Sequence, residues 1–289
     1  MRRLAPIITT ICIVILALSG CTGAAATNEP PPDPAQLLKQ ATDNILAVNT
    51  LKIIVDRTGA DYVLKTDIGS AIFNRMEAQY VAPNLMQAKA KVTLSQLPVE
   101  IEIYARDDDQ WWRIVGTNWA RQTFLPGFNP RALLAEQDRG LRAAFASLEN
   151  VKYVGDEQLD DGTPVYHLTA TADGDKISWM MLYLVQISGA TTIDVYIDKD
   201  KKLPQKLVVV QPSTATDKVK ATTWDMEFYD FNAPPKLTPP TDSEATPEST
   251  AEATPEATLE STVEATSEPT EESTVEATVE ATAEATTSP

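Results

Sequence analysis

The chain has 289 residues and a formal net charge of −17, with 41 acidic residues, 24 basic residues and a single histidine. This acidic balance and the lack of a basic stripe argue against a nucleic-acid-binding protein, because phosphate backbones are bound by clustered lysine and arginine. One histidine and two cysteines cannot supply the ligands of a zinc or copper site, so we expect no metal and no cofactor.

The N-terminus has the three zones of a secretory signal peptide. Two arginines give a positive start, an apolar run extends from Ile7 to Leu18, and small residues precede Cys21. The alternative is a transmembrane helix, but a span needs about 20 apolar residues, and this run is shorter. We therefore predict that residues 1–20 are removed.

The sequence Leu18-Ser19-Gly20-Cys21 resembles the lipobox of bacterial lipoproteins, in which the cysteine thiol receives a diacylglyceryl group. The resemblance implies lipidation of Cys21 and an acyl anchor, such as palmitate, at the outer face of the cell membrane. Residues 21–32 end in three prolines and are predicted to form an extended tether. Cleavage also removes Cys12, so the domain that follows must be stabilised by its own core and not by a disulfide.

The next segment, from Asp33 to Pro240, has the mixed composition of one folded domain. Asp33 followed by Pro34 predicts a helix N-cap and first helical residue. Apolar residues at helical spacing then predict an amphipathic helix over Ala35–Val48.

Short β-rich or alternating segments follow the first helix. A charged run, Asp107-Asp108-Asp109, lies between two of them and predicts a solvated hairpin turn. It lacks the spaced oxygens and the distal glutamate of an EF-hand calcium loop. The predicted strands are Thr50–Arg57, Tyr62–Thr66, Gly69–Gln79, Met86–Leu94, Val99–Arg106, Trp111–Val115, Ala120–Thr123, Val151–Gln158, Val165–Ala170, Ala190–Ile197, Gln205–Gln211 and Thr222–Tyr229.

Two more helices are predicted between these strands. Asn129-Pro130 begins the second helix, which extends to about Asn150. The third extends from Asp175 to about Ile187 and is apolar on nearly every side, so it is buried or lines something apolar. The elements together predict an α+β fold with a large antiparallel sheet.

The last segment, residues 241–289, consists mainly of Thr, Glu, Ala, Ser and Pro. It contains 13 acidic residues and no basic residue. Glutamate recurs every four residues, which would place like charges together on a helix. Prolines interrupt the segment and no apolar face exists, so we predict a disordered tail. An O-glycosylated stalk is a further hypothesis for it.

Catalytic motifs are missing from the sequence. His167 lies in a predicted strand, where a histidine on one face of a sheet is the simplest interpretation. No G-x-S-x-G elbow, G-x-x-x-x-G-K loop or G-x-G-x-x-G loop occurs. We assign no catalytic residue and expect a protein that is not an enzyme.

Several segments in order resemble the LppX/LprAFG family of bacterial lipoproteins. The segment Gly127-Phe128-Asn129-Pro130-Arg131-Ala132-Leu133-Leu134, followed by Arg139-Gly140-Leu141, is similar to the family's "F-[DN]-P-x-x-L-L…GL" pattern. The hairpin from Gly155 to Leu168, Leu203-Pro204 and the closing segment from Tyr229 to Pro240 also match. The long acidic tail departs from the family pattern.

The resemblance implies the fold of the lipoprotein carriers LolA and LolB: a curved antiparallel half-barrel with about three helices covering its concave face. It also implies an apolar cavity and the transport of acylated lipids or glycolipids across the cell envelope. Candidate lining residues are Leu134, Leu141, Phe145, Met180 and Leu184. Ordinary core packing explains the same apolar residues without a cavity, and the sequence leaves both possibilities open.

We therefore expect a monomeric, membrane-anchored carrier of lipid or glycolipid. The alternative is a surface sensor or scaffold that binds an envelope protein or polymer through the convex face of the sheet or the tail. A third hypothesis, an enzyme acting on envelope lipids or glycans, has no positioned pair of acidic residues to support it.

Overall fold

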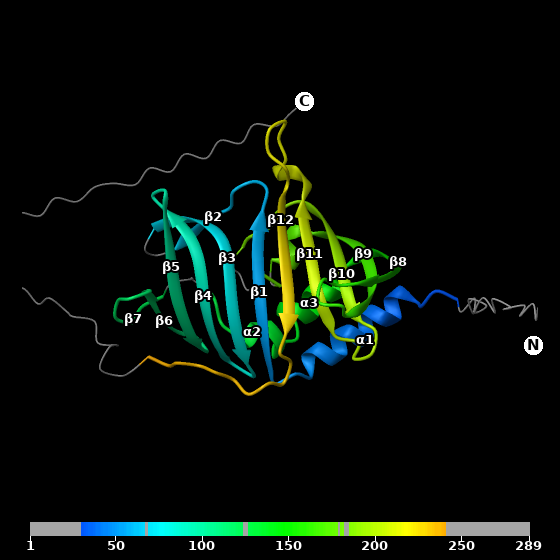
Figure 1. Cartoon of the computed structure of the whole chain (residues 1–289), viewed down its shortest axis with the longest axis horizontal. Coiled ribbons are helices and arrows are strands. Elements are labelled where there is room, and N and C mark those ends of the chain that lie inside the picture. Colours follow the sequence, from blue (N-terminus) through cyan, green and yellow to red (C-terminus); the bar gives the residue numbers. More distant parts are fainter. Residues whose placement is uncertain (1–29, 67–68, 124–126, 179, 182–184, 241–289) are drawn as a thin grey trace, which may run out of the picture. The chain divides into compact units, whose positions relative to one another are not determined.

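The structure is a computed structural model that describes residues 30–66, 69–123, 127–178, 180–181 and 185–240. The described elements form one antiparallel sheet of twelve strands, with short helices on one side of it (Figure 1). This confirms the α+β class and the large curved sheet that the sequence predicts. The predicted signal peptide, the tether with Cys21 and the acidic tail lie outside the described residues.

The strand order is β7-β6-β5-β4-β3-β1-β12-β11-β10-β9-β8, and β2 pairs with β3. The first and last long strands meet in the middle of the sheet, where Lys52 is opposite Tyr229. The strands are β1 (Thr50–Thr58), β2 (Val63–Thr66), β3 (Gly69–Val81), β4 (Leu85–Leu94), β5 (Leu97–Arg106), β6 (Asp109–Ile114), β7 (Ala120–Arg121), β8 (Glu149–Gln158), β9 (Pro164–Asp173), β10 (Ala190–Asp198), β11 (Pro204–Gln211) and β12 (Thr222–Tyr229).

The two faces of the sheet differ because side chains alternate along each strand. In β4, for example, Met86, Ala88, Ala90 and Val92 are buried, while the residues between them are polar. We call the buried face, which is concave and covered by the helices, the inner face, and the polar face the outer face. The core lies between the inner face and the helices.

The first helix agrees with its prediction. It is α1 (Pro34–Leu46), and the Asp33 carboxylate accepts a hydrogen bond from the Ala35 amide at 2.9 Å, as an N-cap does. The buried face of α1 consists of Leu37, Leu38, Ala41 and Ile45.

The predicted second helix, from Asn129-Pro130 to about Asn150, is wrong as a continuous element. It is divided into α2 (Arg131–Leu134) and α3 (Gly140–Ala146). Gly140 begins α3 with a φ of +65°, a left-handed conformation that ends regular helix. The chain therefore turns between the two short helices.

The predicted third helix, Asp175 to about Ile187, is also wrong in length. Among its described residues, helix is confined to α4 (Gly174–Ile177), and Met180 and Met181 follow in a turn. The Ile187 amide donates to the Ser178 hydroxyl oxygen at 2.8 Å, which folds the chain back toward α4. The described apolar residues of this segment, Ile177, Met180, Met181, Val185 and Ile187, are all buried. Trp179 and residues 182–184 lie outside the described residues. In the described chain, no helix is both long and apolar enough to span a bilayer.

Candidate functional site

The inner face and the helices enclose four of the five predicted cavity residues. Leu134, Leu141, Phe145 and Met180 are all buried and belong to one hydrophobic cluster with the inner face of the sheet. Leu134 comes from α2, Leu141 and Phe145 from α3, and Met180 from the turn after α4. The fifth, Leu184, lies outside the described residues.

The inner face is unequal in its two halves. Strands β3, β4 and β5 carry four buried alanines beside larger residues such as Phe73 and Tyr80, and Ala78 is directly opposite Ala88. Ala90 pairs with Ile101 and Met86 with Ala105. The β10–β12 half instead carries the larger buried residues Ile193, Val195, Ile197, Leu207, Val209, Trp224, Met226 and Phe228. The two halves therefore differ in the number of buried alanines on the inner face.

We call Ala78, Ala88, Ala90 and Ala105 the alanine floor. Sequence analysis missed these residues because alanine is apolar but small, and it is depleted in strands. The alternation in Gln87-Ala88-Lys89-Ala90-Lys91 is the signal that could have identified them.

The described chain has two buried carboxylates, and neither lies between the inner face and the helices. Glu102 points outward, and Asp198 accepts from the Asp200 and Lys201 amides in the β10–β11 turn. Tyr80 is enclosed, and burial raises the pKa of its phenol far above the ordinary value of 10.0. Its hydroxyl donates to the Pro83 carbonyl at 3.0 Å. The interior therefore suits an uncharged, apolar occupant.

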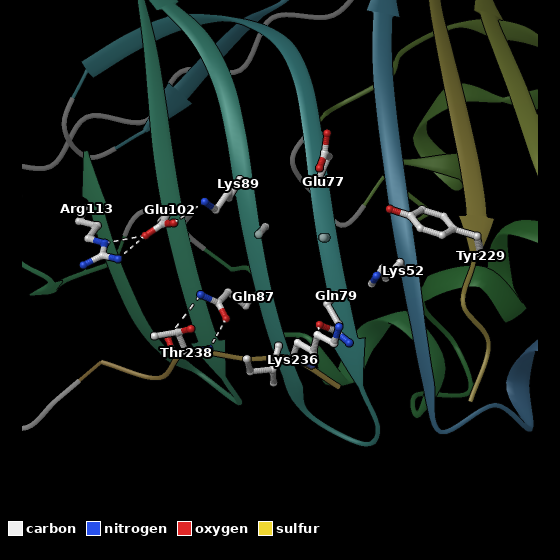
Figure 2. Close-up of a pocket in the computed structure, with 13 residues that line it drawn as sticks. Lys52, Glu77, Gln79, Gln87, Lys89, Glu102, Arg113, Tyr229, Lys236 and Thr238 are labelled. Carbon is white, nitrogen blue, oxygen red and sulfur yellow. Dashed lines mark hydrogen bonds and ion pairs between the residues drawn. The ribbon is translucent and has the colours of Figure 1, made fainter. Parts of the chain in front are cut away.

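Two polar hollows lie on the outer face. One, of about 330 Å³, lies over β3, β4 and β5 beside the segment that follows β12 (Figure 2). The amides of Lys236 and Thr238 donate to the side chains of Gln79 and Gln87 at 3.1 and 2.8 Å, which fixes this segment across the strands. The other hollow, of about 560 Å³, lies between the β8–β9 turn and β10–β12 and includes Tyr196 and Tyr229.

Glu102 is the most enclosed charge of the first hollow, with a side chain that is 8% exposed. Its carboxylate lies 2.9 Å from the Lys89 ammonium and 2.6 Å from the Arg113 guanidinium (Figure 2). Burial by itself would raise the pKa of Glu102, but the hydrogen bonds from Lys89 and Arg113 outweigh it. The pKa therefore lies below the ordinary value of 4.5.

Replacement of Glu102 by glutamine is expected to lower the free energy of unfolding by about 1–3 kcal/mol at neutral pH. A depressed pKa stabilises the fold above pH 4.5, and this contribution is lost as the pH falls through the folded value. Urea unfolding at neutral pH and near pH 3 should thus show the difference from wild type shrinking in acid. Glu100→Gln is the control, because Glu100 is more exposed than Glu102 and lies farther from the Lys89 ammonium, at 4.0 Å. Its replacement should therefore change stability less. A stability difference between wild type and Glu102→Gln that stays constant with pH would contradict the lowered pKa of Glu102.

His167 lies on the outer face, in agreement with the simplest interpretation of the sequence. Its Nδ1 is 2.6 Å from Glu157, its Nε2 is 3.1 Å from Asp194, and its ring stacks on Tyr196. Both ring nitrogens thus contact carboxylates, and neither contacts a serine. Among the described residues, no group of three or more His, Cys, Asp or Glu side chains is arranged to hold a metal ion.

The aspartates of the β5–β6 turn each have a separate partner. Asp107 contacts Arg131 at 3.1 Å, Asp108 accepts from Asn129 at 2.9 Å, and Asp109 contacts Arg121 at 2.7 Å. The turn therefore joins the sheet to the segment that leads into α2.

Comparison with known proteins agrees with this architecture. A family model described as LppX_LprAFG lipoprotein matches residues 33–236. The structure of LprF from Mycobacterium bovis is 17% identical, with a TM-score of 0.56, and the match covers 73% of this chain and 98% of that one. This similarity shows a shared fold.

Two further solved structures are more distant. LppX from Mycobacterium tuberculosis is 17% identical with a TM-score of 0.47, over 72% of this chain and 100% of that one. The LolA superfamily protein NE2245 from Nitrosomonas europaea is 12% identical with a TM-score of 0.26, over 75% of this chain and 99% of that one. No curated protein matches the chain.

Proposed function

The chain belongs to the LppX_LprAFG lipoprotein family, and from this premise we propose that it binds acylated lipid or glycolipid between the inner face and the helices. It carries this cargo across the cell envelope as a monomer and without covalent chemistry. A lipid on Cys21 holds it at the outer face of the cell membrane, after removal of residues 1–20. The tether, the domain and the disordered tail then have the boundaries predicted from the sequence.

The observation that carries the proposal is the apolar interior with the alanine floor on one side. An acyl chain that leaves a bilayer loses about 0.8 kcal/mol for each exposed methylene group, so it needs comparable apolar cover. The inner face supplies that cover from Ala78, Ala88, Ala90 and Ala105, and the helices supply it from Leu134, Leu141 and Phe145. Curved sheets that side chains do not fill are known places for small apolar ligands.

Replacement of Ala88 by phenylalanine separates cargo binding from core packing. If acyl chains occupy the space above the floor, the larger ring takes their place, and bound lipid should fall several-fold while the lipid-free protein keeps its thermal stability. If helices already fill that space, the ring overpacks the core and costs about 1–3 kcal/mol. Native mass spectrometry of residues 22–289, expressed in a bacterial host, measures the lipid, and thermal unfolding measures the stability.

Lys91→Phe is the matched control for this substitution. Lys91 lies on the outer face of the same strand and is exposed, so its replacement should change neither lipid content nor thermal stability. A wild-type protein that carries no lipid, even after incubation with phospholipid vesicles, would overturn the proposed function.

The second candidate is a sensor or scaffold that acts through the outer face. The hollow of about 560 Å³ supports it, because Tyr196, Tyr229 and the carboxylates of Glu157 and Glu227 surround it. Aromatic rings with a few polar groups are typical of binding sites. Binding to isolated cell-wall material that survives Ala88→Phe but is lost in Tyr196→Ala would favour this candidate.

A further inference from the structure

The exposed apolar side chains of the described chain gather at one end of the sheet. Six large apolar residues are exposed, and five of them lie at the end where β4 turns into β5 and where the loops β1–β2 and β11–β12 lie (Figure 1). The sixth, Val154, lies in the middle of β8. The five are Val63, Leu97, Ile114, Val115 and Val219.

At this end the inner face continues outward without a polar interruption. Along β5, Ile101 is buried, Val99 is half-buried and Leu97 is 66% exposed, and all three point to the same face. In β4, Val92 is buried and the half-buried Leu94 is opposite Leu97. In β6, Ile114 is opposite Ile101. We call Leu94, Leu97, Val99 and Ile114 the apolar ramp, because they lead from the core to the solvent.

Lysines accompany the exposed apolar residues. Lys65, Lys218 and Lys220 are exposed and form no ion pair with another described residue. Val219 lies between two of them, and the Lys220 carbonyl accepts from the Ala60 amide at 3.0 Å, which holds this loop against the β1–β2 loop. Asp217 is the acidic residue of the same loop. Exposed aliphatic groups beside cationic ones suit the boundary of an anionic bilayer.

We infer that this end of the half-barrel docks on an anionic phospholipid bilayer, and that acyl chains enter the interior along the apolar ramp. The inference rests on the proposed function for the entry of cargo, but the docking itself does not need it. A lipoprotein family implies a membrane-associated protein, so a bilayer is the occupant that we assign to Leu97 and Val115. The twelve residues between Cys21 and Pro34 reach about 40 Å when extended.

The test is co-sedimentation of residues 22–289, without the anchor, with vesicles of phosphatidylcholine alone or mixed with phosphatidylglycerol. The double variant Leu97→Asp with Val115→Asp should bind the mixed vesicles at least tenfold more weakly than wild type, with unchanged thermal stability. Lys218→Ala with Lys220→Ala should weaken binding several-fold, and only to the anionic vesicles. Val154→Asp is the matched control and should bind as wild type does.

Equal binding by wild type and the Leu97→Asp, Val115→Asp variant would overturn the inference, and so would an equal loss in Val154→Asp. Light scattering tests whether a second copy of the chain occupies this surface instead. A wild-type dimer that dissociates in Leu97→Asp would assign the surface to dimerisation and overturn docking on a bilayer. Native mass spectrometry keeps the proposals apart. Cargo without vesicle binding rejects docking alone, whereas vesicle binding without cargo rejects the carrier function and leaves docking supported.

Discussion

Replacement of Arg57 by methionine is expected to lower the free energy of unfolding by about 2–3 kcal/mol, because it removes the hydrogen bonds of an enclosed, charged guanidinium. Arg57 lies near the end of β1, and its side chain is 8% exposed. Methionine has a similar length and keeps the apolar contacts of the stem. The expected loss therefore comes from the hydrogen bonds of the guanidinium.

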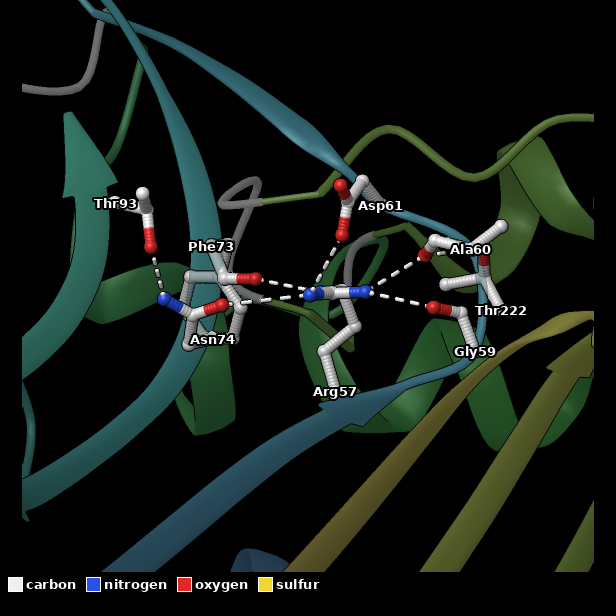
Figure 3. A network of polar contacts seen from close by, with 8 residues as sticks. All are labelled: Arg57, Gly59, Ala60, Asp61, Phe73, Asn74, Thr93 and Thr222. Carbon is white, nitrogen blue, oxygen red and sulfur yellow. Dashed lines mark hydrogen bonds and ion pairs between the residues drawn. The ribbon is translucent and has the colours of Figure 1, made fainter. Parts of the chain in front are cut away.

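The guanidinium joins β1, the β1–β2 loop and β3 (Figure 3). Its Nε donates to the Phe73 carbonyl at 2.6 Å, and one terminal nitrogen donates to the carbonyls of Gly59 and Ala60 at 3.1 and 2.8 Å. The other terminal nitrogen contacts Asn74 and Asp61 at 3.3 and 3.0 Å. Without Arg57, the carbonyl of the buried Phe73 loses a charged donor, which costs about 1–3 kcal/mol. The Ala60 carbonyl still accepts from the Thr222 hydroxyl at 3.1 Å, and Gly59 is exposed to water.

The loop that Arg57 holds lies over one end of the core. Tyr62 belongs to it, and the Tyr62 ring meets the buried Trp224 edge-on at 5.3 Å. The Tyr62 hydroxyl accepts from the Gln186 amide at 2.8 Å, which connects the loop to the segment after α4. Loss of Arg57 should therefore also loosen the cover of the proposed lipid site, and bound lipid should decrease with stability.

Urea unfolding measures this prediction with two controls. Arg57→Lys keeps the charge but loses the planar fork of donors. Its free energy of unfolding should therefore lie between those of wild type and Arg57→Met. Arg121→Leu removes an exposed arginine, with a side chain that is 54% exposed, from its contact with Asp109, and surface pairs contribute less than about 1 kcal/mol. A loss in Arg57→Met no larger than that in Arg121→Leu would contradict the role of the network.

The strands were predictable from the sequence because each carries its own signal. In Val99–Tyr104, apolar and polar residues alternate, and Ile101 and Ile103 are buried in β5 as that pattern predicts. The pairing of β1 with β12 was not predictable, since nothing local in Thr50–Thr58 records a partner that far along the chain. The contacts of Arg57 were not predictable either, because most of its acceptors are backbone carbonyls, which residues of any type supply.

Helical spacing predicted an apolar face with Leu134, Leu141 and Phe145, and an all-round apolar segment included Met180. All four residues are buried. The shape of their elements was not, because periodicity cannot distinguish one long helix from two short ones that bury the same face. For the segment after Asp175, burial on every side produces the same pattern in a loop as in a helix. The alanine floor was missed because alanine is small and is depleted in strands.

Gly140 is the residue that divides the predicted second helix, and Gly140→Ala is expected to lower the free energy of unfolding by about 3–5 kcal/mol. Its φ of +65° is strained for any residue with a Cβ atom. An added Cβ would also lie 1.9 Å from the Ala132 carbonyl oxygen and 2.3 Å from that of Leu133. Because both oxygens belong to the backbone of α2, the helices would have to separate.

Two other glycines serve as controls that distinguish the cost of backbone strain from the cost of a steric clash with α2. Gly127 has a φ of +77° with no atom within 4 Å of an added Cβ, so Gly127→Ala should cost only the strain of about 1–2 kcal/mol. Gly155 has neither feature, and Gly155→Ala should change stability little. Urea unfolding should therefore rank the losses as Gly140, then Gly127, then Gly155. Since α2 and α3 carry Leu134 and Leu141, native mass spectrometry should also show less bound lipid in Gly140→Ala. An equal loss at Gly140 and Gly127 would mean that α2 and α3 do not meet closely enough to cover the inner face.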